Sequence, residues 1–335
     1  MKKNNVGIIG CGMIFPRHYQ SIEANKNFSL VGVCDINIDK LTAASDRYNI
    51  AGHTDFKSML KHQDINFVVI ATPNSQHFAQ AAYCMESGCD VLLEKPAVLN
   101  PSQLDILQAI AAKNNVSAYS VLQVRLNPAV QKIKTLLDNN LIGKVRGVSL
   151  IQRWQRPKEY FDGWRGNPLV GGGTLHECGI HYLDVLCYLF GKPGVVSSKI
   201  YNTKHKHVEV EDTVYSLLDY GDFGASVEVS IASEPKNLEC SISIMTSLGY
   251  IKIGGTALDR LIETKFLDKH LEQGCVNIFE NSKEIKKPNS YTKYKGSCPN
   301  HPELYSQIEN FGLEETRSAI SLIDEIYKKS NKQYY

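Results

Sequence analysis

The feature that most constrains the fold is a glycine-rich turn that joins a short apolar run to an expected helix. Residues 6–10 form the run, Gly10-Cys11-Gly12 follow, and a helix is expected from Pro16 to Ala24. The first glycine permits a tight turn, and the second lets the backbone approach a pyrophosphate at the helix amino terminus. The next expected strand, Ser29 to Cys34, ends in Asp35. A carboxylate there accepts hydrogen bonds from ribose hydroxyls and repels a 2′-phosphate, which favours NAD over NADP.

Strands and helices continue to alternate through the amino-terminal half. The expected elements are a strand from Phe67 to Ala71, a helix from His77 to Glu86 and a strand from Asp90 to Leu93. This alternation predicts a parallel, doubly wound sheet that carries its ligand at the carboxyl ends of the strands.

Lys95 stands at one of these strand ends, within Glu94-Lys95-Pro96. A solvated surface lysine is the ordinary fate of this residue type. The following proline restricts Lys95 to extended backbone, and its position at a strand end favours a functional role in the ligand cleft.

Composition sets the broad class of the protein. A chain of 335 residues with 43% hydrophobic and 21% charged residues is expected to build two cores. A net charge of +2 gives no general attraction to nucleic acid or to an anionic membrane. The apolar stretches are too short to span a membrane, and the first residues lead into a strand, so a cytoplasmic protein is expected. Nine cysteines without a Cys-x-x-Cys pair argue against both a disulfide framework and a structural zinc site, and reduced thiols are expected.

The carboxyl-terminal half changes to longer strands with hairpin signals. Expected strands cover Val208 to Asp219, Ala225 to Ser233 and Ser241 to Ile253, with a turn at Tyr220 to Gly224. These runs predict a large, mostly antiparallel open sheet flanked by helices, an α+β domain beside the α/β domain. The expected boundaries are 1–122 for the dinucleotide-binding domain and 123–335 for the second domain. The basic stretch Lys283 to Lys295 is expected to be a solvated loop.

A helix from Leu175 to Phe190 follows Gly171-Gly172-Gly173 and carries a polar stripe. Glu177, His181 and Asp184 recur at steps of four and three, which places them on one face. Simpler explanations exist: Thr174 and Glu177 fit a capping box, His181 fits a core histidine, and the three together offer metal ligands. Hydride chemistry needs no metal where lysine and histidine are present, so no metal is expected.

Taken together, these segments resemble the Gfo/Idh/MocA oxidoreductase family over nearly the whole chain. The matching motifs are Ala71-Thr72-Pro73-Asn74, Glu94-Lys95-Pro96, Gly171 to Gly173, and Gly179-Ile180-His181-Tyr182-Leu183-Asp184. The stretches from Gln123 to Pro128 and from Tyr160 to Gly166 look most like the branch that oxidises the C3 hydroxyl of UDP-N-acetylglucosaminuronate. That branch commonly has asparagine, and inositol-type enzymes have aspartate, where this chain has Glu177, so this position matches neither group of substrates.

The resemblance implies an NAD-dependent dehydrogenase with His181 as proton acceptor and Lys95 as the cation that stabilises a developing alkoxide. These two roles are interchangeable from sequence, and Glu177 tunes either group or binds a hydroxyl. The expected cofactor contacts are Gly10, Gly12, Met13, Ile14, Asp35, Ala71, Thr72, Pro73, Asn74, His77, Glu94 and Lys95. The expected substrate contacts are Gln123, Arg125, Asn127, Arg156, Tyr160, Trp164, Arg165, Glu177 and His181, with Trp154 as either a contact or a core residue. His301 and Tyr305 match a position that the branch uses near its site.

The expected function is oxidation of a nucleotide sugar or sugar acid, in surface-polysaccharide biosynthesis. Oxidation of a free polyol or sugar is the alternative within enzymes, and a non-catalytic NAD-binding regulator is the alternative outside them. The partners expected are a small-molecule substrate, a UDP-sugar, and further copies of the chain in a homotetramer or homodimer, since the open sheet face commonly forms a subunit interface in this family.

Overall fold

The computed structural model describes residues 3–255, 257–280, 298 and 300–331, and these form two compact units. The first unit holds residues 3–122 together with 298 and 300–317, and the second holds 123–255, 257–280 and 318–331. The chain therefore returns to the first unit near its end. The expected second domain, 123–335, did not include this return and is corrected; the expected loop from Lys283 to Lys295 lies outside the described residues.

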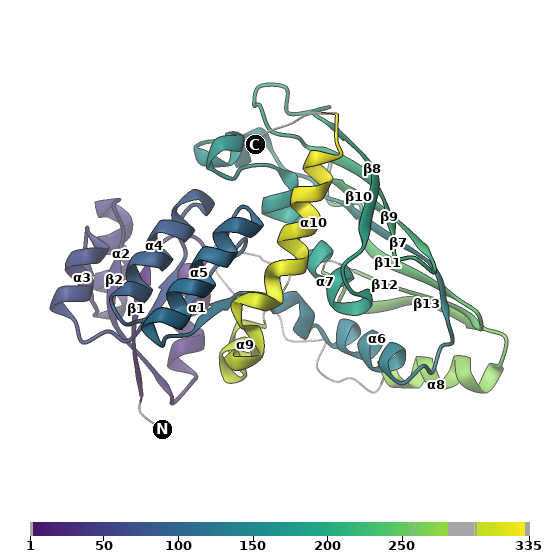
Figure 1. Ribbon diagram of the computed structural model, residues 1–335, viewed down its shortest axis with the longest axis horizontal. Helices are drawn as coiled ribbons and strands as arrows, with labels where there is room; N and C mark the ends of the chain where they lie inside the picture. The colour runs from purple at the N-terminus through teal and green to yellow at the C-terminus, as the bar shows by residue number, and fades with distance from the viewer. Residues whose placement is uncertain (1–2, 256, 281–297, 299, 332–335) are drawn as a thin grey trace. The chain divides into compact units, whose positions relative to one another are not determined.

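The first unit contains a six-stranded parallel sheet in the order β3-β2-β1-β4-β5-β6. Its strands are β1 (Asn4–Ile9), β2 (Phe28–Cys34), β3 (Ala51–His53), β4 (Phe67–Ile70), β5 (Asp90–Leu93) and β6 (Ala118–Ser120). Its helices are α1 (Phe15–Glu23), α2 (Ile38–Tyr48), α3 (Phe56–His62), α4 (Asn74–Glu86), α5 (Pro101–Asn114) and α9 (His301–Ser306). Figure 1 labels the helices α1 to α5 of this unit. This strand order is that of a doubly wound dinucleotide-binding fold, as the sequence predicted.

Burial explains why the central strands read as unbroken apolar runs. All four residues of β4 are buried, as are the last three of β5. A parallel sheet covered by helices on both faces demands this pattern instead of alternation. The strand order reverses between β1 and β4, and ligands of such sheets bind at that point.

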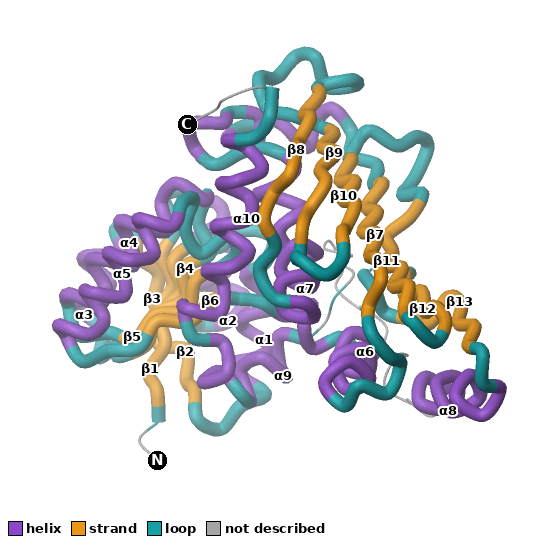
Figure 2. Tube along the Cα trace, turned by 45° about the vertical axis from the view of Figure 1, so that its right-hand side comes forward, coloured by secondary structure: helices purple, strands orange, loops and turns teal. Residues whose placement is uncertain are grey.

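The second unit contains a seven-stranded sheet in the order β13-β12-β11-β7-β10-β9-β8 (Figure 2). The strands are β7 (Val145–Arg153), β8 (Gly194–Tyr201), β9 (Thr213–Asp219), β10 (Gly224–Ser230), β11 (Glu239–Thr246), β12 (Gly249–Gly254) and β13 (Arg260–Phe266). Only the pair β7 and β10 is parallel among these neighbours. The helices are α6 (Pro128–Asp138), α7 (Ile180–Phe190), α8 (Lys269–Glu280) and α10 (Arg317–Lys328), and α6, α7 and α10 lie on one side of the sheet (Figure 1).

Two expected strands differ from the structure in an instructive way. The run from Ser241 to Ile253 is a hairpin of β11 and β12, because the Thr246 hydroxyl accepts hydrogen bonds from the amides of Leu248 and Gly249 and turns the chain. The strand expected from Val208 begins only at Thr213. None of the described helices is long and apolar enough to cross a lipid bilayer.

The cysteines behave as small apolar residues. All nine are free thiols, and all except the half-buried Cys11 are buried. Burial raises the pKa of several of them, as for Cys89, whose pKa rises to about 11.

Candidate functional site

The first unit holds the expected cofactor residues, and two glycines shape the turn after β1. Gly10 adopts φ of +105°, and a side chain there would lie 2.4 Å from the backbone oxygen of Ala71. A Cβ on Gly12 would meet no atom within 4 Å. Gly10 thus lets β1 and β4 end close together, and Gly12 leaves room for a group beside the backbone.

The start of α1 and the end of β2 suit a dinucleotide. Ile14 occupies the N-cap position of α1 and offers no capping hydrogen bond, and Met13 beside it is exposed. The amides of Cys11 and Asn37 each donate 2.8 Å hydrogen bonds to Asp35, one to each carboxylate oxygen. These bonds hold the half-buried carboxylate at the strand end, where it was expected to meet a ribose. The fit supports NAD as the cofactor of this unit.

The loop after β4 is held from inside by His77. Its Nδ1 lies 2.8 Å from the Pro96 oxygen and its Nε2 lies 2.9 Å from the Thr72 oxygen, in a ring that is 0% exposed. Burial lowers the pKa of His77. The ring thus ties the loops after β4 and β5 together, and the expected contact of His77 with the cofactor stays a prediction. Ala71, Thr72 and Pro73 are half-buried, and Asn74 is buried at the start of α4.

Glu94 is buried and contacts a histidine, and its expected cofactor role stays a prediction. Its Oε1 lies 3.0 Å from His18 Nε2, and its Oε2 accepts a 3.2 Å hydrogen bond from the Lys95 amide. Although burial alone raises the pKa of Glu94, the imidazoles of His18 and His301 hold it well below the usual range. Lys95 itself is half-buried, and its peptide bond to Pro96 is cis.

The second unit brings together five of the expected substrate residues. The Arg165 Nε donates a 3.0 Å hydrogen bond to Glu177 Oε2, and the Tyr160 hydroxyl lies 3.4 Å from the same oxygen. Arg165 stacks 5.1 Å over Tyr160 and 4.9 Å over Trp164, and Arg156 stacks 5.3 Å over Tyr160. These five residues, Arg156, Tyr160, Trp164, Arg165 and Glu177, are called the arginine–aromatic cluster below.

The charges of the cluster are set by burial and pairing. Burial, with Cys178 and Glu177 nearby, raises the pKa of Tyr160 well above its usual value, so the phenol is neutral. Burial lowers the pKa of Arg165, but Glu177 and Tyr160 more than offset this and the net shift is upward. Trp154 is buried and stands edge-on to Tyr182 with ring centroids 5.7 Å apart, while Arg156 stacks 4.7 Å over it. Trp154 therefore supports the cluster from the core.

The segment that carries Glu177 and His181 starts as a π-helix, Leu175–Gly179, and continues as α7. Thr174 is already helical, and its hydroxyl donates to the Glu211 backbone oxygen at 2.9 Å. The capping-box interpretation is therefore wrong, since Glu177 faces Arg165. Glu211 supplies the cap instead: its Oε1 accepts a 3.1 Å hydrogen bond from the Leu175 amide. His181 is half-buried.

Three other expected substrate residues are used inside the second unit. The Asp184 carboxylate accepts hydrogen bonds from Arg125 Nε at 2.9 Å and from Arg125 Nη2 at 2.7 Å, and both residues are buried. Asn127 donates to the backbone oxygen of Ala257, and Gln123 is also buried. The side chains of Arg125 and Asn127 therefore connect segments within the second unit, and their contact with a substrate stays a prediction.

Sequence reasoning missed His18 and Glu211 altogether. His18 lies on α1, directly after the glycine-rich turn, and Glu211 lies in an acidic stretch before β9. Their partners are far away in the sequence, so no spacing pattern marks either residue.

Comparison with known proteins agrees with this geometry. Residues 4–122 match the family model described as the oxidoreductase family, NAD-binding Rossmann fold, and residues 130–252 match the GFO/IDH/MocA C-terminal domain. The chain belongs to the Gfo/Idh/MocA oxidoreductase family. Its first unit is accordingly an NAD-binding Rossmann domain.

Similar proteins include dehydrogenases whose names or bound ligands refer to different sugars. The WlbA dehydrogenase from Bordetella pertussis, solved in complex with NADH and UDP-GlcNAcA, shares 25% identity and a TM-score of 0.85 over 98% of this chain and 95% of that one. Oxidoreductase P35 of Formosa agariphila is 33% identical over 64% of this chain and 68% of its own length. The D-glucoside 3-dehydrogenase of Escherichia coli is 30% identical over 57% of this chain and 55% of its own length.

Proposed function

We propose that this protein is an NAD-dependent dehydrogenase that oxidises a secondary hydroxyl, at C3, of a nucleotide sugar or sugar acid. The observation that carries the proposal is the arginine–aromatic cluster, which offers two guanidinium groups and two aromatic faces in one place. Support comes from the likeness to the WlbA dehydrogenase, which extends over nearly the whole of both chains. Surface-polysaccharide biosynthesis is the setting we propose.

The residues that hold NAD in this proposal are Gly10, Gly12, Met13, Ile14, Asp35, the strand-end segment Ala71 to Asn74, and Lys95. When bound, NAD accepts a hydride from the carbon that is oxidised. The first unit supplies the turn, the helix terminus and the ribose carboxylate that orient the nucleotide.

We assign the proton of the sugar hydroxyl to His181 and the stabilisation of the developing alkoxide to Lys95. An imidazole suits proton transfer near neutral pH, and a lysine ammonium stabilises negative charge on oxygen. Lys95 is held by a peptide whose neighbours, Glu94 and Pro96, are fixed by buried contacts. The exchange of roles between His181 and Lys95 remains the alternative mechanism.

Recognition of the sugar rests on the cluster in the second unit. Arg156 and Arg165 suit a carboxylate or a diphosphate, because a guanidinium forms charge-assisted hydrogen bonds with both. Tyr160 and Trp164 offer faces against which a sugar ring packs. Glu177 orients Arg165 and can accept a hydrogen bond from a sugar hydroxyl.

A second candidate is oxidation of a free sugar or glycoside. The observation in its favour is the ion pair between Arg165 and Glu177, because the carboxylate offsets the positive charge that an anionic substrate needs. The similarity to D-glucoside 3-dehydrogenase points in the same direction.

We also propose that the chain forms a homodimer or homotetramer through the outer face of the second sheet. Large apolar side chains are exposed on this face, among them Tyr215 at 47% and Leu217 at 54%. A hollow of about 290 Å³ lies between strands β7, β8, β9 and β10 and is lined by these two residues together with Lys199 and Glu228. The free thiols fit the cytoplasmic location that we propose.

The experiment that tests the function has two steps. The small molecules released on denaturing the purified protein are first identified by mass spectrometry. The intact protein is then given UDP-GlcNAcA, UDP-GlcNAc and methyl glucoside in separate titrations, with NADH absorbance as the readout. A response to the UDP-sugar acid alone supports the proposal, and a preference for the glycoside establishes the second candidate.

A Lys95→Ala variant separates an enzyme from a regulator. Its turnover is expected to fall by roughly 10²- to 10⁴-fold, while NAD still binds through the glycine turn and Asp35. Turnover equal to that of the parent would return the non-catalytic regulator to consideration.

A further inference from the structure

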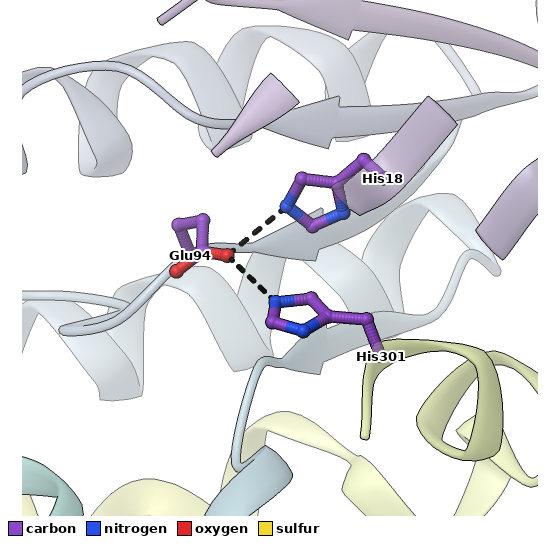
Figure 3. A group of neighbouring side chains, drawn as sticks. All are labelled: His18, Glu94 and His301. Atoms are coloured by element: carbon purple, nitrogen blue, oxygen red, sulfur yellow. Dashed lines mark hydrogen bonds and ion pairs between the residues drawn. The ribbon is translucent and has the colours of Figure 1, made fainter. Parts of the chain in front are cut away.

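Three buried side chains in the first unit converge from distant parts of the chain (Figure 3). His18 comes from α1, Glu94 from the end of β5, and His301 from the start of α9. The exposed fractions of the three residues are 0%, 7% and 1%, respectively. Two imidazole nitrogens and one carboxylate oxygen lie within 4.8 Å of one another.

The separations within this group suit a metal centre. Glu94 Oε1 lies 3.0 Å from His18 Nε2 and 3.6 Å from His301 Nε2. Metal–ligand bonds of about 2.0–2.2 Å in tetrahedral geometry place neighbouring ligand atoms roughly 3.4 Å apart. These two distances lie on either side of that value, and all three ligand atoms lie within 4.8 Å of one another.

His301 provides an independent sign of a ligand. Within the described part of the chain, neither of its buried ring nitrogens has a hydrogen-bond partner, and its Nε2 points towards Glu94, 3.6 Å from Oε1 (Figure 3). A buried polar nitrogen without a partner is unfavourable, because it has lost water and gained nothing in exchange. Coordination of an ion by Nε2 would satisfy that nitrogen.

The surroundings prepare the group for coordination. The hydroxyl of Tyr305 lies 2.9 Å from His18 Nδ1, which leaves Nε2 to face Glu94. Metal-binding histidines commonly have such a partner on the second ring nitrogen, and it fixes the orientation of the ring.

We propose that His18, Glu94 and His301 form a binding site for a divalent transition-metal ion of the zinc type. Two imidazoles and one carboxylate favour such ions over magnesium or calcium, which prefer oxygen ligands. The ion would join α1, the strand end that carries Lys95, and α9. The site is separate from Glu177, His181 and Asp184, the group for which the sequence raised and set aside a metal.

The positive charge of Arg17 lies near the proposed site and opposes cation binding. The Arg17 guanidinium, which donates to the Cys298 oxygen at 3.4 Å, acts electrostatically on His301. The negative charge of Glu94 must outweigh this effect. Glu94→Gln, which keeps the size of the side chain and removes its charge, is therefore expected to abolish binding.

The experiment measures metal content and affinity on the full-length protein. Zinc is added to metal-stripped protein in competition with a chromophoric chelator, and the bound metal is counted by elemental analysis. The parent is expected to bind one zinc per chain. His301→Ala and Glu94→Gln should weaken binding by at least about 100-fold, and Tyr305→Phe by roughly 10- to 100-fold.

A matched control excludes surface binding. His53 and His62 form a neighbouring imidazole pair in the same unit with ring centroids 6.3 Å apart, and His62 is exposed. His62→Ala should bind zinc as the parent does. Loss of all zinc in His62→Ala, or equal zinc in the parent and His301→Ala, would overturn the proposal.

A measurement on the parent alone covers the case in which a variant fails to fold. Cobalt is added to the parent and its visible spectrum is recorded, and thermal unfolding is compared in zinc and in magnesium. An intense tetrahedral cobalt band, together with a rise in Tm of roughly 5 °C in zinc only, supports the site. Absence of both responses contradicts it.

Discussion

Two arginine–carboxylate pairs involve the same helical segment of the second unit and differ mainly in their access to water. Arg125 and Asp184 meet at 2.7 Å with side chains that are 7% and 2% exposed. Arg165 and Glu177 meet at 3.0 Å with side chains that are 24% and 6% exposed, so water reaches this pair at the arginine. The first pair is enclosed by protein on all sides, whereas the second is reached from outside and surrounded by aromatic rings.

The difference teaches how the same chemistry serves two purposes. A buried ion pair holds its two residues in place, and removing one of them leaves an unpaired charge in the interior. A partly exposed pair costs little to break and remains available to a ligand. The sequence presents both arginines as equal candidates for substrate binding, and only burial separates them.

The largest effect on the free energy of unfolding is expected when the buried pair of Arg125 and Asp184 is broken. Asp184→Ala leaves the Arg125 guanidinium buried without its carboxylate, and the free energy of unfolding should fall by roughly 3–5 kcal/mol. Urea unfolding measures this change. Glu177→Ala serves as the matched control, with an expected loss of about 1 kcal/mol or less. Equal losses in the two variants would show that exposure does not distinguish the pairs.

Glu211 shows how burial affects a carboxylate that has no arginine partner among the described residues. Glu211 is buried, takes part in none of the described ion pairs, and accepts hydrogen bonds from the Leu175 amide and the Tyr327 hydroxyl at 2.9 Å. Burial raises the pKa of Glu211 to about 7. The folded protein therefore binds this proton more tightly than the unfolded chain does.

The sign of the pH effect follows from that shift. The stabilising contribution of protonated Glu211 is complete below pH 4.5, its ordinary pKa, and is lost as the pH rises through about 7. Relative to Glu211→Gln, the parent should lose roughly 3 kcal/mol of stability between pH 4.5 and pH 8. Thermal unfolding of both proteins across this range measures the difference, and a constant gap would disprove the effect of burial.

Loss of Arg165, from the partly exposed pair with Glu177, should affect catalysis more than stability. Arg165→Met is expected to lower kcat/KM for a UDP-sugar acid by roughly 100-fold, since charge-assisted hydrogen bonds to the substrate are lost. The free energy of unfolding should change by only about 1 kcal/mol. Steady-state kinetics with the sugar acid and with methyl glucoside supply the comparison, and an equal loss for both substrates would exclude Arg165 from recognising the anion.

The smallest effect is expected at Tyr160. Tyr160→Phe keeps the ring against Arg156 and Arg165 and removes a hydroxyl that lies 3.4 Å from Glu177 and 3.7 Å from Cys178 Sγ. A fall in kcat/KM of about 5-fold is expected for the loss of one weak hydrogen bond. A fall beyond about 100-fold would instead assign proton transfer to the Tyr160 hydroxyl.

The fold was predictable wherever short-range patterns determine structure. The glycine turn after β1, the alternation of strands and helices, and the change to longer strands after residue 144 each follow from local spacing. Gly10 could be predicted because the sharp turn requires its positive φ. The residues of the arginine–aromatic cluster could be listed because four of the five lie within ten positions of one another.

The side-chain pairings that the sequence did not predict depend on contacts between segments far apart in the chain. Arg125 finds Asp184 59 positions away, and nothing near Arg125 in the sequence predicts that pairing. Thr174 and Glu177 fit a capping box, but Glu211, 36 positions after Leu175, takes the capping role. The π-helix at Leu175–Gly179 then separates the expected stripe into a Glu177 that faces Arg165 and an Asp184 that faces Arg125.

The central claim is that hydride leaves C3 of a sugar for the nicotinamide ring. The most direct test is a single turnover of the purified protein with UDP-GlcNAcA deuterated at C3, followed by mass spectrometry of the nucleotide. We expect deuterium in the NADH formed by the parent and none in the nucleotide recovered from Lys95→Ala. Unlabelled NADH from the C3-deuterated sugar, or a nucleotide that stays oxidised with every sugar tested, would contradict the account.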